Sequence, residues 1–196
     1  MTNPHVVLGP RYAEAVGYAS DLHADQTRKS TNIAYISHLL GVSSLVLEAG
    51  GDEDMAIAAL LHDGPEDQGG QATLDEIHVK YGDRVARIVE GCTDSLAEDP
   101  EHKEPWRQRK EKYIAHLKDA ADDALTVSLA DKLHNATSIL RDLRDPAIGQ
   151  SVFERFSATK ADTLWYYQTL SKIFRERSPA PRLAAELSGV VEHISV

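Results

Sequence analysis

The chain has 196 residues, 42% of them hydrophobic, and a formal net charge of −10, which suits one globular domain with a real core. The acidic balance argues against nucleic acid as the main partner, because phosphate backbones are bound by basic surfaces. A single cysteine, Cys92, excludes an internal disulfide and a thiolate zinc site. No apolar run approaches the roughly 18 residues of a membrane span, and the first residues lack a signal-peptide pattern. We therefore expect a cytoplasmic protein with no membrane partner.

Apolar residues recur at helical spacing along the first half of the chain. Asp52 is a plausible N-cap, and Thr73 with Glu76 forms the pattern of a capping box. Gly82 is a typical helix end. The pair Gly64-Pro65 should interrupt a helix, because proline lacks an amide donor and disfavours a helical residue before it. The helices expected here cover residues 12–24, 35–49, 53–63, 73–81 and 83–92.

The second half of the chain is expected to contain longer helices after a polar connection. Residues 94–105 (DSLAEDPEHKEP) are polar and punctuated by proline, which is typical of a loop. We find no alternating strand pattern and no repeat, so the expected fold class is all-α, a helical bundle of about eight to ten helices. One domain is expected over 1–196, with a core of about 10–175 and a helical appendage over about 176–196. The helices expected here cover residues 106–118, 123–140, 151–174 and 179–191.

Four residues carry side chains that bind first-row divalent metals: His38, His62, Asp63 and Asp131. The pair His62-Asp63 follows the apolar run 56–61, so a helix would direct two polar groups into an apolar interior. Burial without partners would cost roughly 2–7 kcal/mol for each neutral polar group, and a bound cation would remove that cost. Two imidazoles and two carboxylates suit Mn²⁺, Fe²⁺, Mg²⁺ or Zn²⁺. A histidine-aspartate pair alone is more often structural; the four residues together favour a metal site.

A second pair of carboxylates, Glu66 and Asp67, follows the first pair at a spacing of four residues. If the helical turn persists through Gly64-Pro65, both pairs face one cleft. A carboxylate near a metal site can orient water, accept its proton or protonate a leaving group. The alternative is a solvated acidic loop after a helix end.

Two cations and an amide are candidates for substrate binding. Arg28 and Lys29 precede the second expected helix, and two cations in an acidic chain suit an anionic substrate. The alternative is a pair of solvated surface charges. Asn135 lies one helical turn after Asp131, where it could contact a ribose or phosphate, or fix the helix that carries the metal ligand. The basic stretch 107–112 is interpreted as a solvated helix face.

The segments that carry these residues resemble one protein family. The order of His38, His62-Asp63 and Asp131 resembles HD-domain metal phosphohydrolases. The segments HADQTRKSTNIAYISHLL, AALLHDGPEDQGG, KYGDRVARIVEGCTDS and SLADKLHNATSIL resemble the hydrolase domain of RelA/SpoT-type alarmone enzymes and their stand-alone relatives, the small alarmone hydrolases. The resemblance implies an all-α fold, a bound Mn²⁺, and hydrolysis of the 3′-pyrophosphate of guanosine tetra- or pentaphosphate (ppGpp or pppGpp). The products would be GDP or GTP and pyrophosphate.

The resemblance also implies roles for individual residues. Those that would hold the metal are His38, His62, Asp63 and Asp131; those that would serve the hydrolytic water are Glu66 and Asp67; those that would contact substrate are Arg28, Lys29 and Asn135. The chain departs from the family pattern at Gly64-Pro65, where Thr or Ala followed by Val is expected, and at Ala136, where Arg is expected. Residues 94–105 match poorly. The chain is too short for an added synthetase domain, so synthesis is not expected.

Two alternatives to a Mn²⁺-dependent alarmone 3′-pyrophosphohydrolase stay open. One is a metal phosphohydrolase for another nucleotide, such as an adenine alarmone or the phosphate of NADPH. The other is a nucleotide-binding HD domain that no longer turns over, for which Gly64-Pro65 is the only support. The expected partner in each case is a small nucleotide. The sequence leaves open the oligomeric state, with a homodimer as one option, and the physiological metal.

Overall fold

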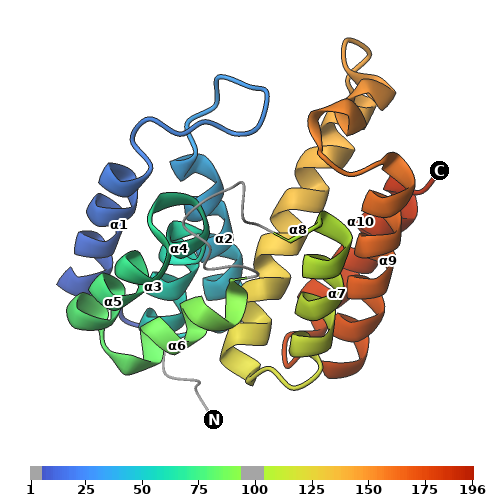
Figure 1. Cartoon of the computed structure of the whole chain (residues 1–196). Helices are drawn as coiled ribbons and strands as arrows, with labels where there is room; N and C mark the ends of the chain where they lie inside the picture. The colour runs from blue at the N-terminus through green and yellow to red at the C-terminus, as the bar shows by residue number, and fades with distance from the viewer. Residues whose placement is uncertain (1–5, 94–103) are drawn as a thin grey trace.

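The computed structural model describes residues 6–93 and 104–196, and these residues form helices and no β-strand (Figure 1). The all-α class expected from the sequence is confirmed. The elements are α1 (Pro10–Leu22), α2 (Ile36–Glu48), α3 (Glu53–Leu61), α4 (Gly64–Gln68), α5 (Gly70–Tyr81), α6 (Asp83–Cys92), α7 (Trp106–Leu117), α8 (Asp122–Arg144), the 3₁₀ helix η2 (Gly149–Arg155), α9 (Lys160–Arg177) and α10 (Pro181–Ile194).

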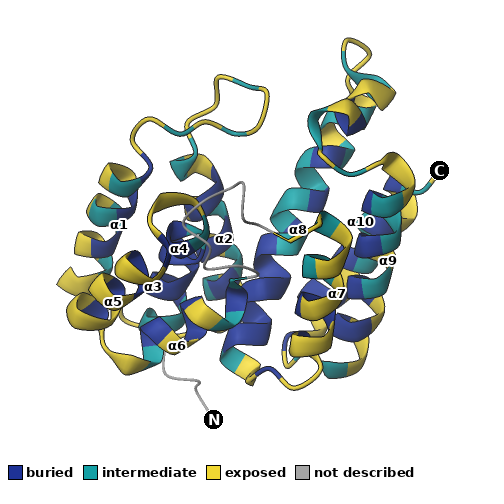
Figure 2. Ribbon diagram, in the orientation of Figure 1, coloured by how far each residue is buried: buried dark blue, intermediate teal, exposed yellow. Residues whose placement is uncertain are grey.

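Helix α8 is the centre of the fold. It packs against α2, α3, α6, α9, α10 and η2, with α1 to α6 on one side of it and α7, α9 and α10 on the other (Figure 1). Every residue from Ala124 to Asp131 is buried, and Figure 2 shows the middle of α8 in dark blue. A helix enclosed on all sides needs apolar residues around its whole circumference. Burial of this stretch places the carboxylate of Asp131 in the interior.

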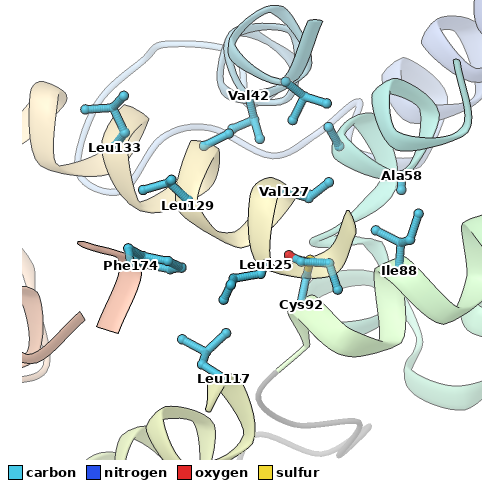
Figure 3. Close-up of a cluster of buried hydrophobic side chains, with 14 of the residues drawn as sticks. Val42, Ala58, Ile88, Cys92, Leu117, Leu125, Val127, Leu129, Leu133 and Phe174 are labelled. Atoms are coloured by element: carbon cyan, nitrogen blue, oxygen red, sulfur yellow. The ribbon is translucent and has the colours of Figure 1, made fainter. Parts of the chain in front are cut away.

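The packing around α8 joins helices from both halves of the chain. Figure 3 shows Leu125 and Leu129 of α8 among Val42 of α2, Ile88 of α6 and Phe174 of α9. These five side chains are completely buried. Burial of a Val, Leu, Ile or Phe side chain stabilises the fold by about 1.5–3 kcal/mol. This packing keeps α2 and α8, which carry candidate ligands, in one rigid unit.

Helix α3 delivers the histidine-aspartate pair to the same interior. The Asp52 side chain accepts a hydrogen bond from the Met55 amide at 3.1 Å, so the N-cap expected from the sequence is confirmed. The apolar run that follows is buried throughout, from Ala56 to Leu61. The chain therefore reaches His62 already enclosed by α2, α6 and α8.

The interruption expected at Gly64-Pro65 is present, and the helical turn nevertheless continues through it. His62 (φ −60°, ψ −32°) and Asp63 (φ −90°, ψ −9°) both keep right-handed helical angles. The Asp67 amide donates to the Asp63 carbonyl at 3.0 Å. Pro65 lies in the first turn of α4, where a missing amide donor costs nothing. The two acidic pairs are therefore one helical turn apart.

The prediction that a capping box at Thr73 opens a helix is wrong. Helix α5 begins at Gly70, so Thr73 lies inside it and its hydroxyl donates to the Gln68 carbonyl at 3.4 Å. Gly69 (φ 148°) and Gly70 (φ 60°) reverse the chain directly after α4, and the next helix begins at once. The expected helix end at Gly82 is confirmed.

The single helix expected over 151–174 is also wrong. The structure has η2 up to Arg155 and a separate α9 from Lys160. Thr159 caps α9, because its hydroxyl accepts from the Asp162 amide at 3.1 Å. This cap lies within the expected helix, so the helical spacing of apolar residues predicted one helix where the structure has two. Of the loop expected over 94–105, residues 94–103 lie outside the described residues.

Helix α10 packs against α8 and α9 and buries Leu183, Leu187 and Ile194. The expected division into a core and a C-terminal appendage stays a prediction. Within the described residues, no helix combines the length and apolar character needed to cross a membrane.

Two glycines provide a test of the backbone. Gly82 joins α5 and α6 at φ 89° and ψ 172°, a region that is almost exclusive to glycine, and an added Cβ would meet nothing within 4 Å. Gly82→Ala should therefore lower the free energy of unfolding by about 1–3 kcal/mol through backbone strain alone. Gly17→Ala, at an exposed position inside α1 that is equally open, should raise it by up to about 1 kcal/mol. Urea unfolding followed by circular dichroism measures both; changes of the same sign would contradict this account.

Candidate metal centre

Three elements bring metal-binding side chains together. His38 of α2, His62 after α3 and Asp131 of α8 each offer an atom, and these atoms lie within 4.8 Å of one another. The Asp131 Oδ1 atom is 3.3 Å from Nε2 of His38 and 3.7 Å from Nε2 of His62. All three side chains are buried. Residues 24 and 69 positions apart in the chain thus meet in the interior, as the sequence predicted.

Asp63, the fourth expected ligand, faces the same two imidazoles. Its Oδ2 atom is 3.4 Å from Nε2 of His38 and 3.1 Å from Nε2 of His62. The Tyr35 hydroxyl donates to this oxygen at 2.6 Å. The Asp63 side chain is 21% exposed, so it forms the open side of an otherwise buried cluster.

The cluster fits a divalent cation. Among the described residues, the Nε2 atoms of His38 and His62 are buried and make no hydrogen bond. Nδ1 of His62 lies 2.9 Å from the Ala59 carbonyl, which can only accept, so Nδ1 carries a hydrogen. Burial lowers the pKa of His62, but Asp63 and Asp131 outweigh it and hold that pKa well above its usual range, so Nε2 exchanges a proton for the cation on binding. Two imidazole nitrogens without a hydrogen-bond partner, next to two carboxylates, are the donor set that a hard-to-borderline cation requires.

The charges of the cluster also suit a cation. Burial raises the pKa of the Asp131 carboxyl, but the Lys132 ammonium and the two imidazoles outweigh it and hold that pKa well below its usual range. Burial likewise opposes ionisation of Asp63, and His62 and His38 hold its pKa well below the usual range. Lys132 contacts Asp131 Oδ2 at 2.6 Å, which leaves Oδ1 toward the histidines. Both carboxylates are therefore in the charged form that binds metals.

Asn135 links the cluster to Arg28. Its amide nitrogen donates to Asp131 Oδ1 at 2.5 Å, and its Oδ1 accepts from Arg28 Nη2 at 2.6 Å. The Arg28 guanidinium lies 5.7 Å from the centre of the Tyr35 ring. Asn135 thus contacts a candidate ligand directly, and it also lines the cavity described below.

The candidate catalytic pair, Glu66 and Asp67, has partners on other elements. Glu66 Oε1 is 3.7 Å from Arg109 Nη1 of α7. Asp67 Oδ2 accepts a hydrogen bond from the side-chain Nε2 of Gln26 at 2.8 Å. Burial and the charges of Asp63 and Asp67 together raise the pKa of the Tyr35 hydroxyl. Glu66 is partly buried and Asp67 is exposed, and their catalytic role stays a prediction.

A cavity of about 610 Å³ opens beside the cluster, between the α1–α2 connection, α7, α8, η2 and α9. Its lining includes Asn135 and many cations, although the chain as a whole is acidic. The carboxylate of Asp142 also lines the cavity and pairs with Arg155 at 2.5 Å, so the wall carries an excess of positive charge. Such an excess in a concavity attracts a small anionic ligand. The basic side chains that line it are Arg28, Lys29, Arg109, Lys110, Lys132, Arg141 and Arg155.

The sequence profile of the HD domain matches residues 15–163. This chain belongs to the HD domain family. The MESH1 protein of Xenopus tropicalis, named guanosine-3′,5′-bis(diphosphate) 3′-pyrophosphohydrolase, is 38% identical over 134 residues, which cover 67% of this chain and 68% of that one. Human MESH1 is 36% identical over 133 residues, 66% of this chain and 68% of that one.

Solved structures agree with this assignment of the HD domain. A metazoan ortholog of SpoT, described as hydrolysing ppGpp, superposes with a TM-score of 0.73 at 25% identity, covering 95% of this chain and 97% of that one. A Listeria monocytogenes protein superposes with a TM-score of 0.67 at 28% identity, over 82% of this chain and 94% of that one. The resemblance to alarmone hydrolases that the sequence indicated is confirmed.

The HD domain contains site residues that the sequence analysis missed or misread. Arg109 and Lys110, interpreted as part of a solvated helix face, line the cavity. Arg155 also lines it, and no local pattern in η2 indicates this. His134 contacts His38, with the two Nδ1 atoms 2.9 Å apart. Its position three residues after Asp131, on the same helix face, was the signal that could have found it.

Proposed function

We propose that this HD domain hydrolyses the 3′-pyrophosphate of guanosine tetra- or pentaphosphate to give GDP or GTP and pyrophosphate. The proposed Mn²⁺ ligands are His38, His62, Asp63 and Asp131. The observation that carries the proposal is that three residues lining the cation-rich cavity, Tyr35, Lys132 and Asn135, each contact a carboxylate of the buried histidine-aspartate cluster. The activity in the names of the MESH1 relatives supports the same substrate class.

The residues of the chain divide the chemistry among them. Water adds to the phosphorus next to the ribose 3′ oxygen, the bond between them breaks, and the 3′ oxygen leaves with a proton. A cation bound by the cluster supplies Lewis acidity, which polarises the phosphoryl group and favours attack by water at neutral pH. Glu66 and Asp67 orient the water and transfer the protons. Arg28 and Lys29 bind the phosphates, and Asn135 holds Asp131 in place.

A direct assay tests the proposal. Purified protein with Mn²⁺ and ppGpp should release GDP and pyrophosphate, and chelation of the metal should stop the reaction until Mn²⁺ is restored. No product at high enzyme concentration would overturn the proposal. A panel that includes an adenine alarmone and NADPH separates the alternative substrates. Tight ppGpp binding without product, with Mn²⁺ saturated, would favour the non-catalytic alternative; the helical turn that continues through Gly64-Pro65, with the Asp67 amide donating to the Asp63 carbonyl at 3.0 Å, supports the catalytic one.

Lys29 tests the role of the cavity in substrate binding. It is exposed at the cavity wall, so its attraction for phosphate should be similar in the ground state and in the transition state. Lys29→Ala should therefore raise KM by about tenfold, which corresponds to about 1.4 kcal/mol, and leave kcat nearly unchanged. Steady-state kinetics with ppGpp measures both constants. Lys172→Ala, at an exposed position of α9 outside this cavity, is the control; a fall in kcat at constant KM for Lys29→Ala would contradict the role.

A further inference from the structure

A second histidine contacts the ligand His38 on the side away from the cluster. Nδ1 of His134, on α8, lies 2.9 Å from Nδ1 of His38, and the ring centroids are 4.8 Å apart at an interplanar angle of 59°. His38 is completely buried, so its Nδ1 atom depends on a protein partner. His134 is that partner, and it lies on the same helix as the ligand Asp131.

The pair of facing nitrogens shares one hydrogen. When Nε2 of His38 binds a cation, its Nδ1 atom carries the hydrogen and donates it. His134 must then present the lone pair of its own Nδ1 atom. The other ligand imidazole, His62, meets the same need with the backbone carbonyl of Ala59. One ligand ring is thus oriented by the backbone and the other by a side chain, which substitution can change.

Gly41 makes room for this arrangement. It lies one turn after His38 on α2, and a Cβ atom built there would fall inside the contact distance of the His134 ring, against Nε2 and Cδ2. Glycine inside a helix costs about 1 kcal/mol relative to alanine. A side chain at this position would displace the His134 ring from His38, so the absence of one has a specific steric reason.

We infer that His134 is a positioning residue for the metal centre: it accepts the Nδ1 hydrogen of His38 and directs Nε2 of that ring toward the cation, and Gly41 provides the space that its ring occupies. The inference rests on the metal centre of the proposed function and extends it to two residues outside the ligand set. It concerns metal affinity and is independent of which nucleotide is hydrolysed.

The first test compares two substitutions of similar size. In His134→Asn the side-chain oxygen can take the place of Nδ1 and accept the hydrogen, whereas His134→Leu fills the space without an acceptor. Titration calorimetry with Mn²⁺ alone should show affinity that is 10–100-fold weaker for the leucine variant and within about threefold of the unaltered chain for the asparagine variant. His193→Leu, an exposed histidine of α10 bonded to the Gly189 carbonyl, should bind Mn²⁺ normally.

The second test is a double-mutant cycle on Gly41, and it holds even if His134→Leu fails to fold. Gly41→Ala should weaken Mn²⁺ binding in the unaltered chain but not in the His134→Ala background, where the ring it would strike is absent. In that background the alanine should raise the melting temperature through its helix propensity.

Three outcomes would overturn the inference. Normal Mn²⁺ affinity of His134→Leu shows that no acceptor is needed, and equal losses in the leucine and asparagine variants assign the effect to packing. Additive effects of Gly41→Ala and His134→Ala remove the steric link. Absence of Mn²⁺ binding by the unaltered chain is a different failure, because it overturns the metal centre itself and with it the proposed function.

Discussion

Asp131→Asn is expected to abolish Mn²⁺ binding and hydrolysis together, although the side chain keeps its shape. The Oδ1 atom of Asp131, like Oδ2 of Asp63, faces both imidazoles, and it lies 3.3 Å from His38 and 3.7 Å from His62. A neutral amide at this position lacks the charge that attracts a cation. The substitution also leaves the Lys132 ammonium without its counter-charge at 2.6 Å, which should cost about 3–5 kcal/mol of the free energy of unfolding. Calorimetric titration with Mn²⁺, urea unfolding and the ppGpp assay measure the three effects.

A double variant separates loss of the ligand from loss of stability. Asp131→Asn with Lys132→Met removes the unpaired buried charge, so most of the stability should return while Mn²⁺ binding and activity stay absent. Asp123→Asn is the matched control: it lies in the first turn of the same helix, pairs with Arg84 and Arg87 at the surface, and should change neither binding nor activity. Stoichiometric Mn²⁺ binding by Asp131→Asn would remove Asp131 from the ligand set.

The parts of the fold that the sequence predicts well are those whose information is local. The apolar run 56–61 has no polar face, so it must be enclosed, and the structure encloses it. Because this run ends at His62-Asp63, its burial places the pair in the interior, whereas the meeting with Asp131 depends on the packing of α3 against α8. The Asp52 cap and the Gly82 end likewise depend only on neighbouring residues. A single-residue shift in either helix would have moved these side chains off the shared face.

The features that the sequence did not predict depend on contacts between distant segments. No residue near Arg109 or Arg155 in the sequence distinguishes a cavity-lining arginine from a surface one. The two arginines reach the same cavity wall only because α7 packs against α9 and η2 packs against α8. A separate α9 forms because the Thr159 cap begins a new helix where the apolar spacing alone predicts one continuous helix. Helix α5 begins at Gly70 because the chain reverses at Gly69-Gly70, before the capping box predicted at Thr73. Local patterns identified each competing signal but gave no means of ranking them.

The acidic chain and its basic cavity are consistent with each other. A net charge of −10 argues against binding a long polyanion over an extended surface. The cations gathered in one concavity instead select an anion small enough to enter it, and Trp106, Tyr166 and Tyr167 of the same lining offer flat apolar surfaces beside them. A nucleotide with several phosphates combines the two chemistries that this wall presents.

Glu66→Gln is expected to separate catalysis from metal binding. Glu66 lies one helical turn after the His62-Asp63 pair but is not itself in the cluster of ligand atoms, so the glutamine variant should bind Mn²⁺ with unchanged affinity. Glutamine keeps the size of the side chain and cannot exchange a proton. If Glu66 serves the hydrolytic water, kcat for ppGpp should fall by on the order of 10²–10⁴. Single-turnover kinetics with saturating Mn²⁺ measures the chemical step directly.

Two comparisons decide how a loss of rate in Glu66→Gln is interpreted. The variant also neutralises the partner of Arg109, 3.7 Å away, so Arg109→Gln reports the part of the effect that comes through this contact and should cost less in kcat than Glu66→Gln does. Glu76→Gln, which removes an exposed carboxylate of α5 paired with Lys80, should leave kcat and Mn²⁺ affinity unchanged. Normal turnover by Glu66→Gln would transfer the proton-transfer role to Asp67, whose replacement by asparagine should then produce the full loss, because Asp67 is the remaining carboxylate on that turn of α4.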